Sequence, residues 1–176
     1  MTQNQNATNQ DRPHKMMWRS WGTDAFNEAE KEDKPILLML TATWCHWCHI
    51  MDSTTYNDDT VADYLNEHFI PIRVDSDRRP DINERYNMGG WPSTAFLTPS
   101  GDTLTGATYI APEDMQHVMQ QVRDVYTQRR DYVNQQVSHV RSQAEAQQPI
   151  LLLGAKPTLS VLSTVTENIL KIFEPE

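Results

Sequence analysis

The sequence predicts an α/β fold: a mixed central sheet of about four strands, flanked by helices and followed by a long C-terminal helical extension. Three observations predict it. Short apolar runs of strand length alternate with segments of helical periodicity. The alternation begins as strand, helix, strand, and a right-handed crossover makes those two strands parallel. A Pro-Ser-Gly-Asp turn at residues 99–102 then joins two further strands as an antiparallel hairpin.

The predicted elements follow one another closely. Residues 23–32 have the apolar stripe of a helix, and Pro35 ends it. Residues 36–41 form a continuous apolar run, which is typical of a strand covered on both faces. A helix carrying the two cysteines comes next. The remaining predicted elements are a helix after Asp58, a strand at 70–74, a short helix at 79–86 and hairpin strands at 93–97 and 103–110.

The two ends of the chain differ from its centre. Residues 1–15 are rich in Asn and Gln and lack periodicity, which predicts a disordered leader. Apolar residues recur at helical spacing over 112–147, and a second amphipathic stretch begins near Pro157. We therefore expect a leader at 1–15, a folded domain at 16–130 and, at 131–176, a helical extension that leads to a missing C-terminal domain.

Composition narrows the classes of partner. The 176 residues carry a formal net charge of -9 and no basic cluster, which argues against nucleic acid and an anionic membrane as partners. No apolar stretch approaches the roughly 18 residues of a membrane span, and the amino terminus lacks the pattern of a signal peptide. A cytoplasmic location is the resulting expectation.

The most informative motif is Cys45-His46-Trp47-Cys48, which contains both cysteines of the chain. At the start of a helix this spacing puts the two sulfurs about one turn apart, with the first facing solvent and the unpaired amides of the helix end. That position favours a thiolate at Cys45, and a thiolate is the nucleophile of disulfide exchange. In a cytoplasmic protein the pair predicts redox or metal chemistry rather than a structural disulfide.

Three alternatives stay open for the motif. The cysteines can be inert members of a scaffold that serves as an interaction module. Because His49 follows Cys48, the string also satisfies the C-x-x-C-H pattern of haem attachment. A zinc ion would need four ligands, and only His46 and His49 lie near the two sulfurs in the sequence. We expect neither a metal nor a cofactor.

Pro92 is the second anchor of the predicted site. It follows two glycines and Trp91 at the start of a strand, a setting that favours a cis peptide bond. We expect its backbone to pair with a substrate strand beside the cysteines. Trp44, Trp47 and Trp91 are predicted to line an apolar docking surface around the sulfurs. For Trp44, a place in the core is an equal alternative.

Seven motifs occur in order between residues 18 and 112. They are Lys34-Pro35-Ile36-Leu37, Cys45-His46-Trp47-Cys48-His49-Ile50-Met51, Leu65-Asn66-Glu67, Val74-Asp75, Arg79-Pro80-Asp81-Ile82, Gly89-Gly90-Trp91-Pro92 and Thr108-Tyr109. With them, this half of the chain resembles the thioredoxin-like amino-terminal domain of the spermatogenesis-associated thioredoxin-domain family, whose bacterial and archaeal members join it to a large α/α-barrel.

The resemblance implies a thioredoxin-like fold with Cys45 and Cys48 as the redox pair and Pro92 as the cis-proline. It also implies that the helix from Thr158 is the entry to the barrel, so that the C-terminal domain of a parent chain is one partner. The sequence departs from thioredoxins at Met39, which stands six positions before the first cysteine, where they carry a buried acid.

The function predicted from these residues is thiol-disulfide oxidoreduction, with a protein or small-molecule disulfide or dithiol as substrate. Cys45 attacks a substrate disulfide and Cys48 resolves the mixed disulfide. His46, Trp47 and His49 are predicted to modulate the pair. A cationic His46 beside the thiolate would lower the pKa of Cys45 and make the pair more oxidising.

Overall fold

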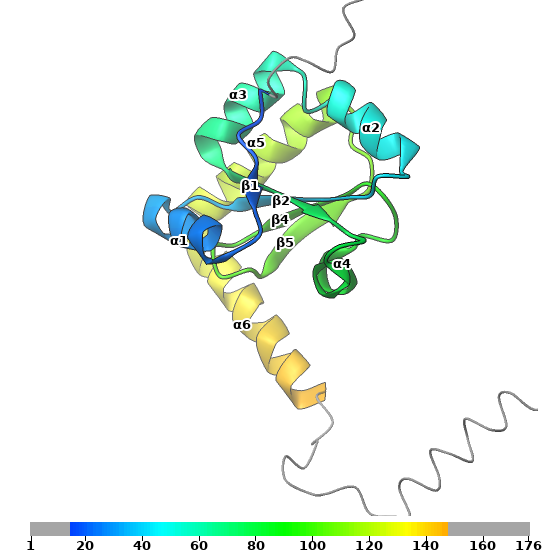
Figure 1. Cartoon of the computed structure of the whole chain (residues 1–176). Helices are drawn as coiled ribbons and strands as arrows, with labels where there is room; N and C mark the ends of the chain where they lie inside the picture. The colour runs from blue at the N-terminus through cyan, green and yellow to red at the C-terminus, as the bar shows by residue number, and fades with distance from the viewer. Residues whose placement is uncertain (1–14, 148–176) are drawn as a thin grey trace, which may run out of the picture. The chain divides into compact units, whose positions relative to one another are not determined.

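The computed structural model describes residues 15–147 (Figure 1). Its elements in chain order are β1 (Arg19–Ser20), α1 (Thr23–Glu32), β2 (Ile36–Thr41), α2 (His46–Ser53), α3 (Asp59–His68), β3 (Ile70–Asp75), α4 (Pro80–Tyr86), β4 (Ser93–Leu97), β5 (Thr103–Ala107), α5 (Pro112–Gln128) and α6 (Arg130–Gln147).

Five strands form one mixed sheet in the order β1-β3-β2-β4-β5. Strands β1, β3 and β2 run parallel, β4 pairs antiparallel with β2, and β5 pairs antiparallel with β4. The β2-α2-α3-β3 crossover is the predicted parallel unit, and β4-β5 is the predicted hairpin. The structure thus confirms the mixed α/β sheet flanked by helices.

Strand β2 lies at the centre because both of its faces are apolar. Alternate side chains of a strand point to opposite faces. Leu37 and Met39 pack into a core with α2, α3 and α5, whereas Ile36, Leu38 and Leu40 pack into a second core with α1 and α4. Helices therefore cover both faces of the sheet, as Figure 1 shows.

Two features of the fold differ from the prediction. The fifth strand, β1, has two residues, Arg19 and Ser20, which pair with Ile72 and Arg73 of β3. A segment this short carries no periodicity. The helix expected over 112–147 is also divided at Arg129, whose φ is -122° and ψ is 40°. The side chain of the next residue, Arg130, turns back toward α1, a tertiary contact that helical periodicity does not record.

Contacts between residues divide the chain into two units, with the first ending at Val137 and the second beginning at Ser138. The boundary expected between residues 130 and 131 stays a prediction. Of the leader expected at 1–15, residues 1–14 lie outside the described residues, and so does the amphipathic stretch after Pro157.

Within residues 15–147, no helix combines the length and the apolar character that crossing a membrane requires.

Candidate functional site

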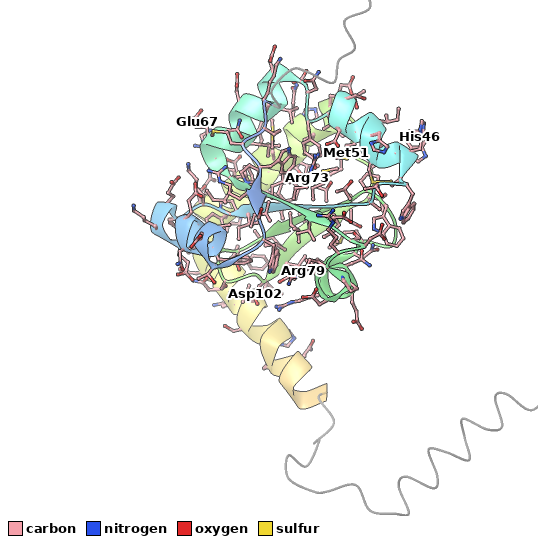
Figure 2. All side chains as sticks on the ribbon, viewed as in Figure 1. His46, Met51, Glu67, Arg73, Arg79 and Asp102 are labelled. Atoms are coloured by element: carbon pink, nitrogen blue, oxygen red, sulfur yellow. A yellow bond between two sulfur atoms is a disulfide. The ribbon has the colours of Figure 1, made fainter. Side chains whose placement is uncertain are left out.

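The cysteine pair lies where β2 passes into α2. Cys45 is the N-cap of α2, and its sulfur accepts a hydrogen bond of 3.1 Å from the backbone N–H of Cys48. The two cysteines form a disulfide with their Cα atoms 5.3 Å apart. His46 occupies the first turn of the helix (Figure 2). The first sulfur is therefore held at the helix end, where unpaired amides stabilise a negative charge.

The pair is less exposed than the sequence suggested. Only 5% of Cys45 and none of Cys48 is accessible, and both pack with Ala42 and against the half-buried Trp91. The expectation that Cys45 faces solvent is thus wrong. Cys45 is almost fully buried, because Trp91 packs against it. Of the two cysteines, only Cys45 has any accessible surface.

The loop before β4 brings Trp91 and Pro92 to the disulfide. Ser93 pairs with Leu40 near the end of β2, so the loop lies beside the segment that leads to Cys45. The Trp91–Pro92 peptide bond is cis and Pro92 is buried. Trp91 donates its indole N–H to Ser76 at 3.0 Å. Two segments distant in the sequence therefore frame one sulfur pair.

Side-chain hydrogen bonds fix the shape of this loop. The Asn87 side-chain oxygen accepts the backbone N–H groups of Gly89 and Gly90 at 2.7 and 3.0 Å. The Ser93 hydroxyl accepts the N–H of Met88 at 2.8 Å and donates to the carbonyl of Gly90 at 2.6 Å. The backbone beside Pro92 is consequently ordered before any ligand arrives.

Two pairs of aromatic rings flank the disulfide. Trp44 is 63% exposed and its ring centroid lies 5.3 Å from that of Trp91. Trp47 is 57% exposed and its ring lies 5.5 Å from Tyr109. The Trp44 indole N–H donates to the carboxylate of Asp77 at 3.1 Å. The core alternative for Trp44 is therefore wrong, and the tryptophans next to the cysteines present apolar surface to solvent.

The two histidines of the motif are placed differently. His49 lies on the exposed side of α2, with its Nε2 atom 3.0 Å from the carbonyl oxygen of Thr43. This contact ties α2 to the loop that precedes Cys45. His46 is exposed, and its ring centroid lies 6.0 Å from that of Trp47.

An ion pair beneath α2 was missed by the sequence analysis. Met39 is fully buried, and its sulfur accepts a hydrogen bond of 3.4 Å from Arg73 of β3. The same guanidinium pairs with Asp52 of α2 and lies 4.7 Å from the Trp18 ring centroid. Burial lowers the pKa of Arg73 to about 10, which still leaves it cationic at neutral pH. The sequence signal that could have indicated this ion pair was Arg73, a charged residue within the otherwise apolar strand 70–74.

The described residues 15–147 contain no group of three His, Cys, Asp or Glu side chains close enough together to hold a metal ion. The reactive groups that the site brings together are the two sulfurs.

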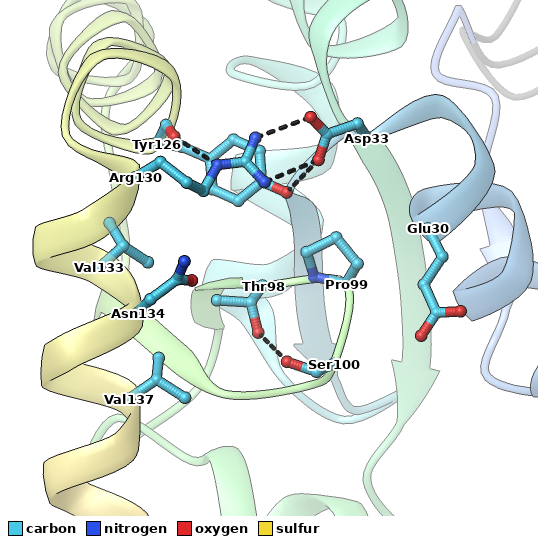
Figure 3. Close-up of a pocket in the computed structure, with 10 residues that line it drawn as sticks. All are labelled: Glu30, Asp33, Thr98, Pro99, Ser100, Tyr126, Arg130, Val133, Asn134 and Val137. Atoms are coloured by element: carbon cyan, nitrogen blue, oxygen red, sulfur yellow. Dashed lines mark hydrogen bonds and ion pairs between the residues drawn. The ribbon is translucent and has the colours of Figure 1, made fainter.

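The opposite edge of the sheet holds a separate hollow of about 250 Å³ (Figure 3). Asp33, next to the start of β2, accepts two hydrogen bonds of 2.8 and 2.7 Å from Arg130 and one of 2.9 Å from the Tyr126 hydroxyl. Thr98 and Ser100, after β4, contribute another wall, and their hydroxyls lie 2.9 Å apart. Since β2 runs from this edge toward Cys45, the hollow and the disulfide lie at opposite ends of the strand.

The strand order, the crossover helices and a cysteine pair at the start of α2 define a thioredoxin-like protein. The chain belongs to the family described as "Thioredox_DsbH: Protein of unknown function, DUF255", whose model matches residues 3–145.

Known proteins agree with this assignment. Over 105 residues the chain is 40% identical to Spermatogenesis-associated protein 20 of Rattus norvegicus, a match covering 55% of this chain and 13% of the relative. It is 26% identical over 91 residues to the Thiol:disulfide interchange protein DsbD of Campylobacter jejuni, covering 50% of this chain and 16% of that protein. The chain is thus similar to about an eighth of the rat protein, and the resemblance to the spermatogenesis-associated family is confirmed.

A thioredoxin from Thermus thermophilus shares the fold. Its solution structure gives a TM-score of 0.55 at 18% sequence identity, over 61% of this chain and 87% of that one.

Proposed function

We propose that this domain is a thiol-disulfide oxidoreductase in which Cys45 and Cys48 alternate between dithiol and disulfide. The observation that carries the proposal is a disulfide at the first turn of α2, framed by the ordered loop that contains Pro92. A relative named as a thiol:disulfide interchange protein supports the same chemistry.

The reaction balances with the groups of this site and a disulfide substrate. The Cys45 thiolate attacks one substrate sulfur, the substrate S–S bond breaks, and the leaving sulfur departs as a thiolate that takes a proton from water. Cys48 then gives its proton to solvent and attacks the Cys45 sulfur. The second substrate sulfur leaves, so the substrate gains two electrons and the cysteine pair loses them. The reverse sequence oxidises a substrate dithiol.

The other residues of the predicted site receive supporting roles. The backbone beside Pro92 pairs with the substrate strand. Trp44 and Trp91 offer the apolar surface next to Cys45, while His46, Trp47 and His49 modulate the pair from the first turn of α2. The substrate is a protein or small-molecule disulfide or dithiol, and the C-terminal domain of a longer parent chain is a further partner. The cytoplasmic location stays a prediction.

Alkylation of the reduced protein tests the proposal. We expect the iodoacetamide rate at Cys45 to rise with pH through a thiol pKa below the ordinary value of about 8.5, because the helix end and His46 favour the thiolate. The Cys45→Ser variant controls for reaction at Cys48. An ordinary thiol pKa together with no catalysis of disulfide exchange would contradict the proposal.

One observation favours a second candidate, an interaction module in which the disulfide is structural. Both cysteines are almost fully buried, as inert cysteines in a scaffold would be. Unfolding of the oxidised and reduced forms separates the two candidates. A structural disulfide would make the oxidised form much more stable, by about 2–4 kcal/mol, whereas a pair that cycles between both states is expected to leave the reduced form folded.

A further inference from the structure

The exposed surface next to the disulfide is asymmetric in charge. On one side, a chain of contacts runs from Asp77 through Trp44 and Trp91 to the sulfurs. Asp77 accepts the Trp44 indole N–H at 3.1 Å, the two indole rings pack edge to face at 5.3 Å, and Trp91 packs against the disulfide. Only the ring of Trp91 therefore separates a ligand bound at Asp77 and Trp44 from Cys45.

The carboxylate of Asp77 is available to a cation. Asp77 is exposed, and the indole N–H that it accepts brings no charge to neutralise it. Of the two arginines that follow, Arg79 pairs with Asp81 at 2.7 Å, and the exposed Arg78 lies 3.6 Å from Asp75. Among the ion pairs within residues 15–147, none involves Asp77.

The same hydrogen bond orients the Trp44 ring. Donation from its nitrogen edge to Asp77 fixes that edge, while 63% of the side chain stays accessible. A cation is attracted by the face of an indole ring and by a carboxylate at its edge. Trp44 and Asp77 together therefore form a partly exposed binding site for an ammonium or guanidinium group.

The other side of the disulfide has a different character. Trp47, 57% exposed, pairs with Tyr109 at 5.5 Å, and the neighbouring side chain is His46, at 6.0 Å. The aromatic pair suits an apolar side chain, and no carboxylate is hydrogen-bonded to these two rings in the described residues, unlike Asp77 at Trp44. The two sides thus select different side chains.

We propose that the substrate of this site is a basic polypeptide segment, in which a Lys or Arg near the reacting cysteine lies on Trp44 beside Asp77 and an apolar side chain lies on Trp47 and Tyr109. The proposal rests on the proposed oxidoreductase function and narrows its substrate to one class. It ranks basic peptides above glutathione, which has a net negative charge and no apolar side chain. The acidic net charge of -9 favours the encounter with a basic partner.

Matched peptides test this selectivity. Each peptide carries one cysteine in a mixed disulfide with an uncharged chromophoric thiol, and Lys, Gln or Glu stands two residues before or two residues after that cysteine. The second-order rate of chromophore release by the reduced protein is measured for every peptide. We expect Lys to exceed Glu by about three- to tenfold at one of the two positions, the size that an exposed cation-π contact and ion pair together supply.

Variants and salt identify the source of the preference. Asp77→Asn and Trp44→Ala should each bring the Lys-to-Glu ratio toward one, whereas Asp124→Asn, an equal charge change on the exposed side of α5, should leave the ratio unchanged. Salt at about 0.5 M should reduce the preference in the wild type, because exposed charges are screened.

The outcomes separate the two proposals. Rapid release from all peptides at equal rates, or a preference for Glu, would overturn the basic-segment proposal and leave the oxidoreductase intact. A Lys preference that survives both Asp77→Asn and Trp44→Ala would overturn the assignment to this surface. No release from any peptide, with both thiols of the reduced protein accessible to alkylation after unfolding, would overturn the proposed function itself.

Discussion

The two ends of strand β2 use their polar and aromatic groups in opposite ways. At the Asp33 end, the carboxylate is bound by Arg130 and Tyr126 of the same chain, and the Arg130 guanidinium also stacks at 4.1 Å on the Tyr126 ring. At the Cys45 end, two tryptophans are more than half exposed. The first end holds parts of the domain together, whereas the second leaves aromatic rings exposed to solvent.

The difference between the two ends indicates which of them is available for binding. Hydrogen bonds satisfied within the chain stabilise it, whereas apolar rings kept in water are costly unless a partner covers them. In the hollow at the Asp33 end, the charged groups of Asp33 and Arg130 already bind each other. At the Cys45 end, the exposed indole rings lie next to the proposed redox pair. Four sets of variants test this difference between the two ends.

The largest effect is expected from the cysteines. Cys45→Ser removes the nucleophile, so catalysed exchange should fall to the uncatalysed background, while Cys48→Ser should retain the first step and accumulate a mixed disulfide with the substrate. Mass spectrometry of the trapped adduct distinguishes the two variants. If Cys48→Ser formed no adduct and Cys45→Ser did, the assignment of nucleophile and resolving thiol would have to be exchanged.

The next effect concerns the strand that supports the Pro92 loop. A Cβ atom at Gly106 would lie 2.6 Å from the sulfur of Met88 and 2.8 Å from the carbonyl oxygen of Thr94. Gly106→Ala should therefore lower the free energy of unfolding by about 1–3 kcal/mol and, by displacing Met88, slow exchange as well. Denaturant unfolding measures the loss. Gly22→Ala is the matched control, because no atom lies within 4 Å of its added Cβ, and an equal loss in both variants would contradict the packing account.

A crossed pair of variants compares the two ends directly. Tyr126→Phe deletes the hydrogen bond to Asp33 and should cost about 1 kcal/mol of stability without changing exchange. Trp47→Ala removes an exposed side chain, so its stability should stay within about 0.5 kcal/mol of wild type while exchange with a protein disulfide falls several-fold. Unfolding and exchange are measured on both. The reverse pattern would show that the Asp33 end takes part in function.

The smallest effect depends on pH. Hydrogen bonds from Arg130 hold the pKa of Asp33 below its ordinary value of 3.8. A lowered pKa means that the ionised form is favoured in the folded state, so the stabilisation is full above the ordinary value and is lost as pH falls through the lower, folded value. Asp33→Asn should therefore be less stable than wild type near neutral pH, by less than about 1 kcal/mol because the pair is exposed.

In denaturant melts run from about pH 7 to pH 2, we expect the free energies of unfolding of wild type and Asp33→Asn to become equal at acid pH. A constant difference would assign the effect to something other than ionisation. Asn tolerates the positive φ of 52° at this position, so the substitution adds little backbone strain.

The elements that the sequence predicted correctly are those with a strong local pattern. Strand β2 is apolar throughout, the Pro-Ser-Gly-Asp turn marks the β4-β5 hairpin, and Asp58 caps α3 through a hydrogen bond to the N–H of Val61 at 3.0 Å. Each of these signals acts within a few residues. The cysteine pair at the start of α2 was found for the same reason.

The features that escaped prediction depend on contacts between distant segments. Strand β1 exists through its pairing with β3, and α5 and α6 are separate helices where Arg130 reaches Asp33. The Arg73–Asp52 pair joins β3 to α2, and the Trp44–Asp77 contact joins two loops. Periodicity and spacing carry no information on which distant residues meet, so these contacts could be found only in the structure.

A redox titration is the test of the redox chemistry that we propose for the Cys45 end of the sheet. The protein is equilibrated in thiol-disulfide buffers of defined potential, and the oxidised fraction is read by alkylation and mass spectrometry. We expect one two-electron transition with a midpoint between about -270 and -120 mV, the range of thioredoxin-like redox proteins. A pair that stays oxidised at potentials below about -300 mV would be a structural disulfide and would contradict the account.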